Sequence, residues 1–597
     1  MTELVFKGKE FVWNHHLAVP FRPLEVQADK GIGPVRLDGN LIVQGDNLHA
    51  LKALLPMYAG RVDCIFIDPP YNTGNEGWAY NDNVNAPMIR EWLDANPIGI
   101  EDGLRHDKWC AMMWPRLRLL HELLADGGTF FVTIDDNETH RLRAMLDEVF
   151  GVECFIAEVI WRSSDSSNND AKRFSQDHNT VLVYSKDIDW VAEKLERDEA
   201  ANAHYSNPDN DPRGPWFPGN LSSPNPRENL RYEVEHPSGR VLAPPPNGWR
   251  WSKELMRRKI DTGEIVFVDT ERGLLRKTYL ADQKGLSPSS LWADLEATGH
   301  TRNAKYELKR IFSEMDTSEL FSTPKPTKLL ARILQVVGNK SAIILDSFAG
   351  SGTTAHALLE ANKRDGGNRR FILVEMEDYA DRLTAERVRR VINGYDFTGT
   401  QRTELLRESL TWTKLQKADR LTEQVEKIEN LHGHEYDRIT KQVKDGELIV
   451  TGEKRVEDRA EGLGGEFTYC TLGKPVELDH ILTGEDLPDY AALAGVLFHM
   501  ATSQPLDPAR MDEGNAYVGA ANGTHVWLIY RPDLDWLKSP EAALTLSFAR
   551  QVAEAQPDAR HLVFAPARYV SQRMLDAEGL PVEFVPLPFA LYRVERT

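Results

Sequence analysis

This sequence has few cysteines, no long apolar run and no apolar stretch typical of a secretory leader. Its 597 residues include four cysteines, Cys64, Cys110, Cys154 and Cys470, and none of these forms a CxxC pair. This spacing argues against a disulfide framework and a zinc site, and it fits a reducing cytoplasm. No run reaches the roughly 18–20 apolar residues that span a bilayer, and the N-terminal sequence MTELVFKGKEFVWNHH has no apolar signal core. We therefore predict a cytoplasmic protein with no metal site and no membrane contact.

An excess of positive charge is also missing. The chain has 71 Lys and Arg against 91 Asp and Glu, a net charge of -20. Proteins that bind nucleic acid normally gain affinity by neutralising phosphates with basic residues, so this charge is a mild argument against such a partner. It does not exclude one, because only the docking face has to be positive. A GxxxxGK[ST] phosphate loop is absent as well, so any ATP-driven motor would be a separate protein.

The length predicts two to four compact units. Residues 1–40 are polar and interrupted by Pro and Gly, which indicates an N-terminal arm. Over 41–190, apolar runs such as VDCIFI, GGTFFVTID and TVLVYSK alternate with helical patterns, and the same pattern returns over 319–400. Apolar strands separated by helices predict an α/β fold with a mostly parallel sheet covered by helices on both faces.

Two further segments differ from this core. Residues 191–318 are rich in Pro, Asn, Arg and Trp and form an insertion in the α/β domain. Residues 401–597 form a separate C-terminal α+β domain that begins with a long charged helix, a candidate for interaction or dimerisation. Pairing with another helix and packing on its own domain both stay open, because too few heptads are sustained for a coiled coil. The apolar positions of this helix are Trp412, Leu415, Leu421, Val425, Ile428 and Leu431.

The first chemical motif is Asp68-Pro69-Pro70-Tyr71, directly after the strand VDCIFI. The carboxyl ends of strands are where open α/β sheets place ligands. Asp68 and a nearby carbonyl can accept the two hydrogens of an exocyclic amine, which makes its nitrogen a nucleophile. Pro69 has no N–H and stiffens the turn, so its carbonyl can be aimed inward. Tyr71 offers a flat face to a base swung out of a duplex. The alternative is a plain Pro-Pro turn with a half-buried tyrosine.

The second motif is DSFAGSGTT, which follows the strand SAIIL and opens a helix. Its glycines allow a ligand to approach the backbone, and Glu375 ends the next strand, where a carboxylate can hold ribose hydroxyls. The loop lacks the lysine of a phosphate loop and is not GxGxxG, so it suits an uncharged nucleoside with an amino-acid tail. The alternative is a structural tight turn. The candidate ligand contacts here are Asp346, Phe348, Ala349, Gly350, Gly352, Thr353 and Glu375.

Together the two motifs resemble the catalytic and cofactor signatures of DNA amino-methyltransferases, in the order of the β group. The runs IDPPYNTGNEGWAYND, PDNDPRGPW, FSTPKPTKLL and DSFAGSGTTAHALL are similar to adenine methyltransferases related to the modification subunits of type III restriction systems. The resemblance implies a Rossmann-like methyltransferase fold and S-adenosylmethionine as the cofactor. It also implies adenine N6 as the target, because position 68 is Asp rather than Ser. Tyr71 departs from close relatives, which often carry Phe there.

The resemblance also assigns roles beyond the two motifs. Asp46 in GDNLHALKALLP would contact the cofactor adenine. The segment FSTPKP, which includes Lys325, would line the methionine end of the cofactor site, and Asp68 would contact the cofactor there as well. The insertion 191–318 would be the target-recognition domain for double-stranded DNA. A homodimer and a separate helicase-nuclease restriction subunit are the implied protein partners.

Basic residues interleaved with aromatics in the insertion suit contacts to DNA backbone and bases. Solvated charges with small-core aromatics are the alternative for about half of them. The polar run from Asn72 to Gly77 is either a loop that closes over substrate or an ordinary polar turn. Rival functions are methylation of RNA or protein, and a mainly DNA-binding specificity subunit. The DNA-binding candidates are Arg213, Trp216, Arg231, Arg250, Arg302 and Lys305.

Overall fold

The computed structural model describes residues 3–73, 103–444, 446–475, 487–502, 504–537, 539–557 and 559–587. The chain divides into two compact units. The first comprises Met1–Val191 and Ser289–Thr597, and the second is Ala192–Pro288. Most of the polar run that follows Asn72, from Gly74 onward, lies outside the described residues.

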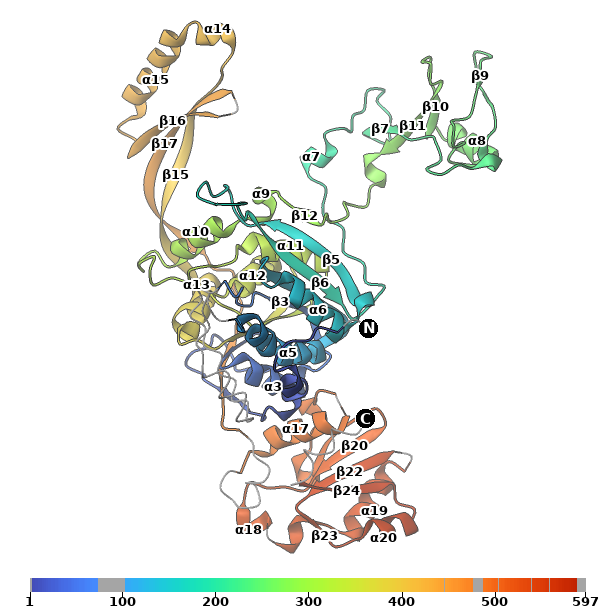
Figure 1. Cartoon of the computed structure of the whole chain (residues 1–597), viewed down its shortest axis with the longest axis vertical. Helices are drawn as coiled ribbons and strands as arrows, with labels where there is room; N and C mark the ends of the chain where they lie inside the picture. Colours follow the sequence, from blue (N-terminus) through green and yellow to red (C-terminus); the bar gives the residue numbers. More distant parts are fainter. Residues whose placement is uncertain are drawn as a thin grey trace. The chain divides into compact units, whose positions relative to one another are not determined.

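A ten-stranded sheet forms the centre of the first unit (Figure 1). Six neighbouring strands, from β18 to β4 in sheet order, are parallel, whereas β6 runs antiparallel to both of its neighbours. This arrangement confirms the predicted Rossmann-like α/β fold. In sheet order the strands are β1 (Leu24–Val26), β18 (Thr468–Leu472), β2 (Leu41–Gln44), β14 (Arg370–Glu375), β13 (Ile343–Asp346), β3 (Val62–Ile67), β4 (Leu124–Ile134), β6 (His178–Ser185), β5 (Phe155–Arg162) and β12 (Leu291–Trp292).

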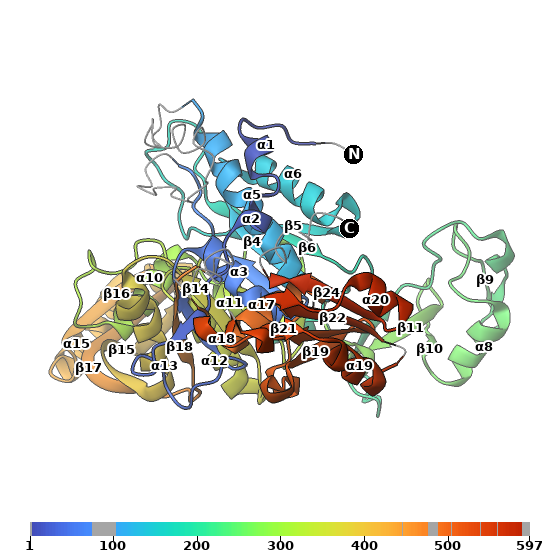
Figure 2. The same ribbon diagram turned by 90° about the horizontal axis from the view of Figure 1, so that it is seen from below.

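Two groups of helices cover the sheet on opposite faces (Figure 2). The central strands are apolar throughout, and Ile65, Leu345 and Ile372 are completely buried. Burying one such side chain contributes about 1.5–3 kcal/mol, so both faces have to be covered. One group is α3 (Asn47–Tyr58), α5 (Arg105–Leu123) and α6 (Thr139–Phe150), with the short α1 (Lys9–Val12) and α2 (His15–Ala18) against α5; the other is α11 (Thr327–Val337), α12 (Thr353–Asp365) and α13 (Glu386–Asn393), joined by α9 (Leu295–Thr298) and α10 (Thr301–Ile311).

The strand order changes direction between β3 and β13, although both strands run the same way. From β3 the sheet continues to β4, and from β13 it continues to β14 on the other side. β3 and β13 are parallel neighbours, with Cys64 opposite Ile344 and Ile65 opposite Leu345. Their carboxyl ends therefore meet at a topological switch point, which is where α/β sheets open a ligand crevice. The two motifs singled out in the sequence begin at these two strand ends.

The sheet also takes strands from outside the core segments expected from sequence. β1 belongs to the N-terminal arm, β12 to the insertion, and β18 to the region expected as a separate C-terminal domain. β18 pairs in parallel with β2, and β1 pairs antiparallel with β18. These strands have three, two and five residues. Such short pairings depend on a neighbour that is distant in sequence, so local pattern does not reveal them.

The predicted helix from residue 401 is wrong for its first part. Residues up to 409 belong to the long strand β15 (Gly394–Ser409), which pairs antiparallel with β17 (Glu447–Glu461). β16 (Arg438–Lys444) adds to the other edge of β17. Only α14 (Trp412–Leu415) and α15 (Ala418–His432) are helical, after the end of β15 (Figure 1). Val425 is buried, whereas Trp412 and Leu431 are exposed.

The last part of the first unit contains a further sheet, with four strands of mixed direction. α17 (Tyr490–Thr502) packs on it and also against α3, and the Leu506 N–H donates to the Pro56 carbonyl at 2.6 Å. The sheet is β19 (Tyr517–Ala521), β20 (Thr524–Leu528), β22 (Arg560–Ala565) and β24 (Val582–Pro586); the other elements are α18 (Leu534–Leu537), β21 (Ala543–Leu544), α19 (Leu546–Ala555), β23 (Ala567–Arg568) and α20 (Gln572–Ala577).

The second unit has a small core of its own. Trp249, Met256 and Ile265 are among its buried residues. The insertion was expected to end at 318, but the compact unit ends at Pro288 and α10 belongs to the first unit. No helix in the described ranges of either unit is long and apolar enough to cross a membrane. The elements of this unit are α7 (Glu199–Asn202), β7 (Trp216–Gly219), β8 (Val234–Glu235), β9 (Val241–Leu242), α8 (Lys253–Asp261), β10 (Ile265–Phe267) and β11 (Leu274–Tyr279).

Candidate active site

Asp68 lies at the switch point, one residue beyond β3, with both of its oxygens engaged. Oδ1 accepts a hydrogen bond of 2.5 Å from the Thr133 hydroxyl on β4. Oδ2 forms an ion pair with the Nζ of Lys325, which precedes α11. Pro69 and Pro70 end the strand here because neither can donate to the sheet. The carboxylate is thereby held at the carboxyl end of β3 by one group from β4 and one group just before α11.

Tyr71 is packed beside Asp68. Its hydroxyl accepts from the Asn179 side chain on β6 at 2.9 Å, and the Lys325 Nζ lies 5.1 Å from its ring centroid. Burial, and next the charge of Asp68, raise the pKa of Tyr71 well above its usual range, so the ring stays neutral. The Pro70 carbonyl accepts from the indole of Trp109 at 2.7 Å. Side chains from other elements therefore hold Asp68, Pro70 and Tyr71 in place, which a plain Pro-Pro turn would not require.

The glycine loop connects β13 to α12. Gly350 and Gly352 have φ angles of 51° and 76°, a region that side-chain-bearing residues rarely adopt. A Cβ on Gly350 would lie 3.0 Å from the ring of Phe321, and one on Gly352 would lie 3.0 Å from the Thr384 carbonyl oxygen. The Gly350 N–H donates to Glu375 Oε2 at 2.8 Å. A larger residue at either position would adopt an unfavourable φ and would bring its Cβ too close to a neighbouring atom.

Asp346 and Glu375 add two buried carboxyls at neighbouring strand ends. Burial, with smaller contributions from the charges of Asp68 and Glu375, raises the pKa of Asp346 to about 7. It accepts from the Thr354 hydroxyl at 2.5 Å and from the Phe348 N–H at 3.1 Å, which oppose the rise. Burial likewise raises the pKa of Glu375 to about 7. Keeping these groups charged is costly, which is typical of functional sites.

Asp46, the predicted adenine contact, is the N-cap of α3. It accepts from the Leu48 and His49 N–H groups at 3.0 and 3.2 Å. Arg116 pairs with its other oxygen at 3.3 Å. Burial alone would raise the pKa of Asp46, but the His49 hydrogen bond and the Arg116 charge lower it to about 2. Because the Gly45 N–H donates to the Glu375 carbonyl at 3.0 Å, Asp46 follows directly on the strand end beside Glu375.

The remaining predicted loop residues have internal partners. Phe348 is half-buried and packs on the core, and the Ala349 N–H donates to the Val374 carbonyl at 3.1 Å. The Thr353 hydroxyl accepts from the fully buried Arg387 at 2.8 Å. Sequence reasoning missed Arg387, and it also missed Thr133, Trp109 and Asn179 as supports, because each reaches the site from another element. Among the supporting residues that were not predicted, Phe321 alone lies in a motif recognised in the sequence, the run FSTPKP.

The DNA-binding candidates are divided between the two units. In the second unit, Arg213 pairs with Asp211 and Arg231 with Glu228, while Arg250 is exposed. In the first unit, on α10, Arg302 pairs with Asp165 at 2.7 Å and Lys305 is exposed.

Trp216 corrects one of these predictions. Its side chain is buried, with 9% of the residue surface exposed, and its indole donates to Asp209 at 2.9 Å. The Nζ of Lys277 lies 5.2 Å from its ring centroid. Trp216 therefore packs inside the second unit and offers no open face on which a base could stack. An aromatic residue in a polar, Pro-rich segment suggested stacking, but a small core needs such residues first.

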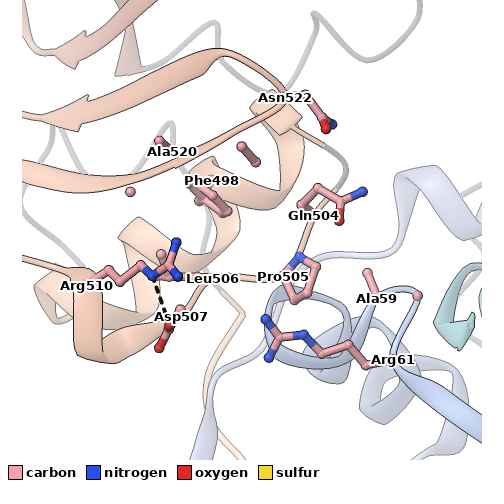
Figure 3. A pocket seen from close by; sticks show the side chains of 13 residues that line it. Ala59, Arg61, Phe498, Gln504, Pro505, Leu506, Asp507, Arg510, Ala520 and Asn522 are labelled. Atoms are coloured by element: carbon pink, nitrogen blue, oxygen red, sulfur yellow. Dashed lines mark ion pairs between the residues drawn. The ribbon is translucent and has the colours of Figure 1, made fainter. Parts of the chain in front are cut away.

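A cavity of about 360 Å³ lies elsewhere in the first unit, between the turn Ala59–Arg61 and the segment around Arg510 (Figure 3). Asp507 and Arg510 form an ion pair of 3.3 Å on its wall. Arg61 precedes β3, whereas the candidate site follows its carboxyl end. The cavity is therefore separate from the candidate active site.

Comparison with known proteins finds one family match that spans both motifs. A family model described as DNA methylase matches residues 62–386, which contain both motifs. The chain belongs to this DNA methylase family.

Three relatives illustrate the match. The type II methyltransferase M.KpnI of Klebsiella pneumoniae is 30% identical over 366 residues, covering 58% of this chain and 82% of that protein. The Mod subunit of the type III restriction-modification enzyme StyLTI of Salmonella typhimurium is 32% identical, covering 57% of this chain and 52% of that subunit. The EcoPI Mod subunit of Escherichia phage P1 is 31% identical, covering 57% and 58%. The chain thus matches little more than half the length of these two subunits.

Proposed function

We propose that this chain transfers a methyl group from S-adenosylmethionine to the N6 of a target adenine in double-stranded DNA. The observation that carries this proposal is the meeting of Asp68 and the glycine loop at the adjacent carboxyl ends of β3 and β13. One strand end supplies acceptors for an amine, and the other supplies a cradle for a nucleoside. The family match supports the same chemistry.

The residues present fit the cofactor. The cradle at Gly350 would be filled by a Cβ, and Glu375 and Asp346 are buried carboxyls with raised pKa values. Glu375 would hold the ribose hydroxyls and Asp46 would face the adenine end, while Phe321 would wall the loop. Lys325 would lie at the methionine end. When bound, the cofactor supplies an electrophilic sulfonium methyl group.

The residues of the chain prepare the adenine. Each carboxylate oxygen has more than one lone-pair site, so Asp68 can accept from N6 while Thr133 and Lys325 hold it in place. The Pro69 carbonyl accepts a hydrogen bond from the second N6 hydrogen, and the proton that N6 loses on methylation passes to solvent by way of Asp68. Tyr71 supports the flipped ring by stacking. Positioning of two bound partners provides most of the rate, and no covalent intermediate on the enzyme is needed.

The experiment that tests this function is expression of the chain in a bacterial host without adenine methylation, followed by single-molecule sequencing of the genome. We expect N6-methyladenine at one short sequence motif, and none in cells that carry the Asp68→Ala variant. N4-methylcytosine would overturn the choice of base. Absence of modified DNA, with methyl transfer to RNA or protein in extracts, would overturn the choice of substrate.

We further propose that the chain acts as the modification subunit of a restriction enzyme. The StyLTI and EcoPI relatives carry that name, and the sequence of this chain holds no GxxxxGK[ST] motor motif. Purification of a tagged chain from its host should recover a separate helicase-nuclease subunit. The resemblance to β-group enzymes also predicts a homodimer, which sedimentation of the pure protein measures directly. Recovery of the chain alone, with full methylation activity, would contradict the role as a subunit.

A further inference from the structure

The residue that follows Tyr71 is held in an unusual conformation. Asn72 has a φ of 58° and is completely buried. A residue with a side chain costs free energy in this left-handed region and stays there only when its surroundings determine it. Its side-chain nitrogen donates to Glu138 Oε1 at 2.5 Å and to the Arg105 carbonyl at 3.3 Å. Asn72 is thus tied to the ends of both α5 and α6.

Glu138 is a fully buried carboxylate whose side chain does not cap a helix. It immediately precedes α6, but its side chain forms no capping hydrogen bond. Besides Asn72, it pairs with the ring of His106 and, at 3.3 Å, with Arg141. A buried charge is tolerated only when it is paired and hydrogen-bonded, so the geometry around Glu138 is specific. Glu138 is the point at which Asn72, α5 and α6 are joined.

The main chain on the other side of Tyr71 is fixed as well. The Trp109 indole donates to the Pro70 carbonyl, and Trp109 is completely buried. Tyr71 is therefore anchored at the residue before it by Trp109 and at the residue after it by Asn72. The Asn179 hydrogen bond fixes the far end of its ring. Together these contacts determine both the backbone and the ring orientation of Tyr71.

We propose that Glu138 is a positioning residue for the methyl transfer, acting through Asn72 to hold Tyr71 in the orientation in which it stacks on the target base. This inference rests on the proposed function, since Tyr71 is the base-stacking residue of that mechanism. A displacement of about 1 Å in a positioning group can lower a rate by as much as about 100-fold. Glu138 touches neither proposed substrate, so its loss should change kcat and leave binding of S-adenosylmethionine almost unchanged.

The test exchanges the donor and the acceptor of this hydrogen bond. Asn72→Asp places two carboxylates in contact, and we expect kcat for tritiated methyl transfer to plasmid DNA to fall by up to about 100-fold. Glu138→Gln alone, which keeps an acceptor but loses the charge, should fall less. In the double variant the new amide at position 138 can donate to the new carboxylate at position 72, and kcat should recover by about tenfold over Asn72→Asp. The control is Glu153→Gln, at an exposed position beside α6, which should match the parent.

Two measurements separate positioning from folding and from the proposed function itself. Equal losses of cofactor affinity and of kcat, without recovery in the double variant, would mean a merely structural role and overturn the proposal, as would a parental rate in Asn72→Asp. Amide exchange of the peptide around Tyr71–Thr73 should speed up in Asn72→Asp and slow again in the double variant. If the parent protein itself methylates nothing, the proposed function fails, while unchanged exchange would independently refute the anchoring by Glu138.

Discussion

Lys325 and Asp68 form an ion pair across 257 positions of sequence. This contact joins the segment before the glycine loop to the strand end that carries the amine acceptor. Lys325 lies just before the first residue of α11, so the N-terminal end of that helix lies at the carboxyl end of β3.

Replacement of Gly350 tests whether the loop is a cradle. Gly350→Ala combines a φ of 51° with a contact of 3.0 Å to Phe321. We expect an affinity for S-adenosylmethionine at least tenfold weaker, measured by calorimetry, since the backbone must move away from the ligand. Gly366→Ala is the matched control, because its φ is 67° but nothing lies within 4 Å of the added Cβ. Both variants should lose about 1–2 kcal/mol of stability from the left-handed conformation. Equal cofactor affinities in the two variants would contradict the cradle.

The pH dependence of cofactor binding tests Glu375. Its pKa is raised to about 7 by burial, and only the ionised carboxylate accepts from two ribose hydroxyls. Binding should therefore be tightest above pH 7 and weaken as the pH falls, by at most about tenfold per unit for one proton. In Glu375→Gln that dependence should be reduced, with weaker binding at pH 8. A parental pH profile in the variant would show that Glu375 does not hold the ligand.

The ionised, buried carboxylate of Asp346 should lower the free energy of unfolding, although it serves cofactor binding. Its folded pKa of about 7 lies above the ordinary value of 3.8, so the unfolded state ionises first as the pH rises. Stability is then lost between about pH 4 and pH 7, by at most roughly 4 kcal/mol. Asp346→Asn should unfold at a higher urea concentration than the parent at pH 8, with little difference at pH 4, and should bind cofactor less tightly.

Asp365→Asn provides a control of the opposite sign. The hydrogen bond from Arg369 lowers the pKa of Asp365 to about 2, so its contribution to stability is present above the ordinary pKa and lost as the pH falls toward 2. Asp365→Asn should therefore be less stable than the parent at pH 8. An Asp346→Asn protein that is also destabilised at pH 8 would contradict the cost assigned to that buried carboxyl.

The exposed basic side chains test the DNA interface. Arg250→Ala and Lys305→Ala should each weaken binding to double-stranded DNA and reduce the slope of log affinity against log salt by about one. Arg573→Ala, at an exposed position on α20, should leave both quantities unchanged. Fluorescence anisotropy over a salt series measures the three slopes. If Arg573→Ala weakens DNA binding as much as the other two variants do, the C-terminal sheet also contacts DNA and the assignment of the interface is wrong.

Local pattern was enough to predict the centre of this fold. Strands such as Val62–Ile67 are apolar throughout, and Pro69-Pro70 and the glycines at 350 and 352 mark where strands end. Both motifs therefore fell on strand ends, and the parallel sheet brought them together. The charged strand Gly394–Ser409 could not be recognised in this way, because its pairing with β17 provides the stability that its own composition lacks.

The supports of the site were hidden for a related reason. Glu138 resembles an ordinary acidic residue ahead of a helix, and only the fold brings it to Asn72. Trp216 resembles a stacking residue, and only the core of the second unit shows that it is buried. Residue type and spacing indicate chemistry, whereas the direction of a side chain depends on elements distant in sequence.

The most direct test of the site is methyl transfer by the purified protein with Asp68 replaced. Asp68→Ala and Asp68→Asn should each transfer tritiated methyl groups to plasmid DNA at least about 100-fold more slowly than the parent, as for loss of a group that acts on charge in the transition state. Both variants should still bind S-adenosylmethionine, since the glycine loop is intact. Transfer at the parental rate by Asp68→Ala would contradict the account.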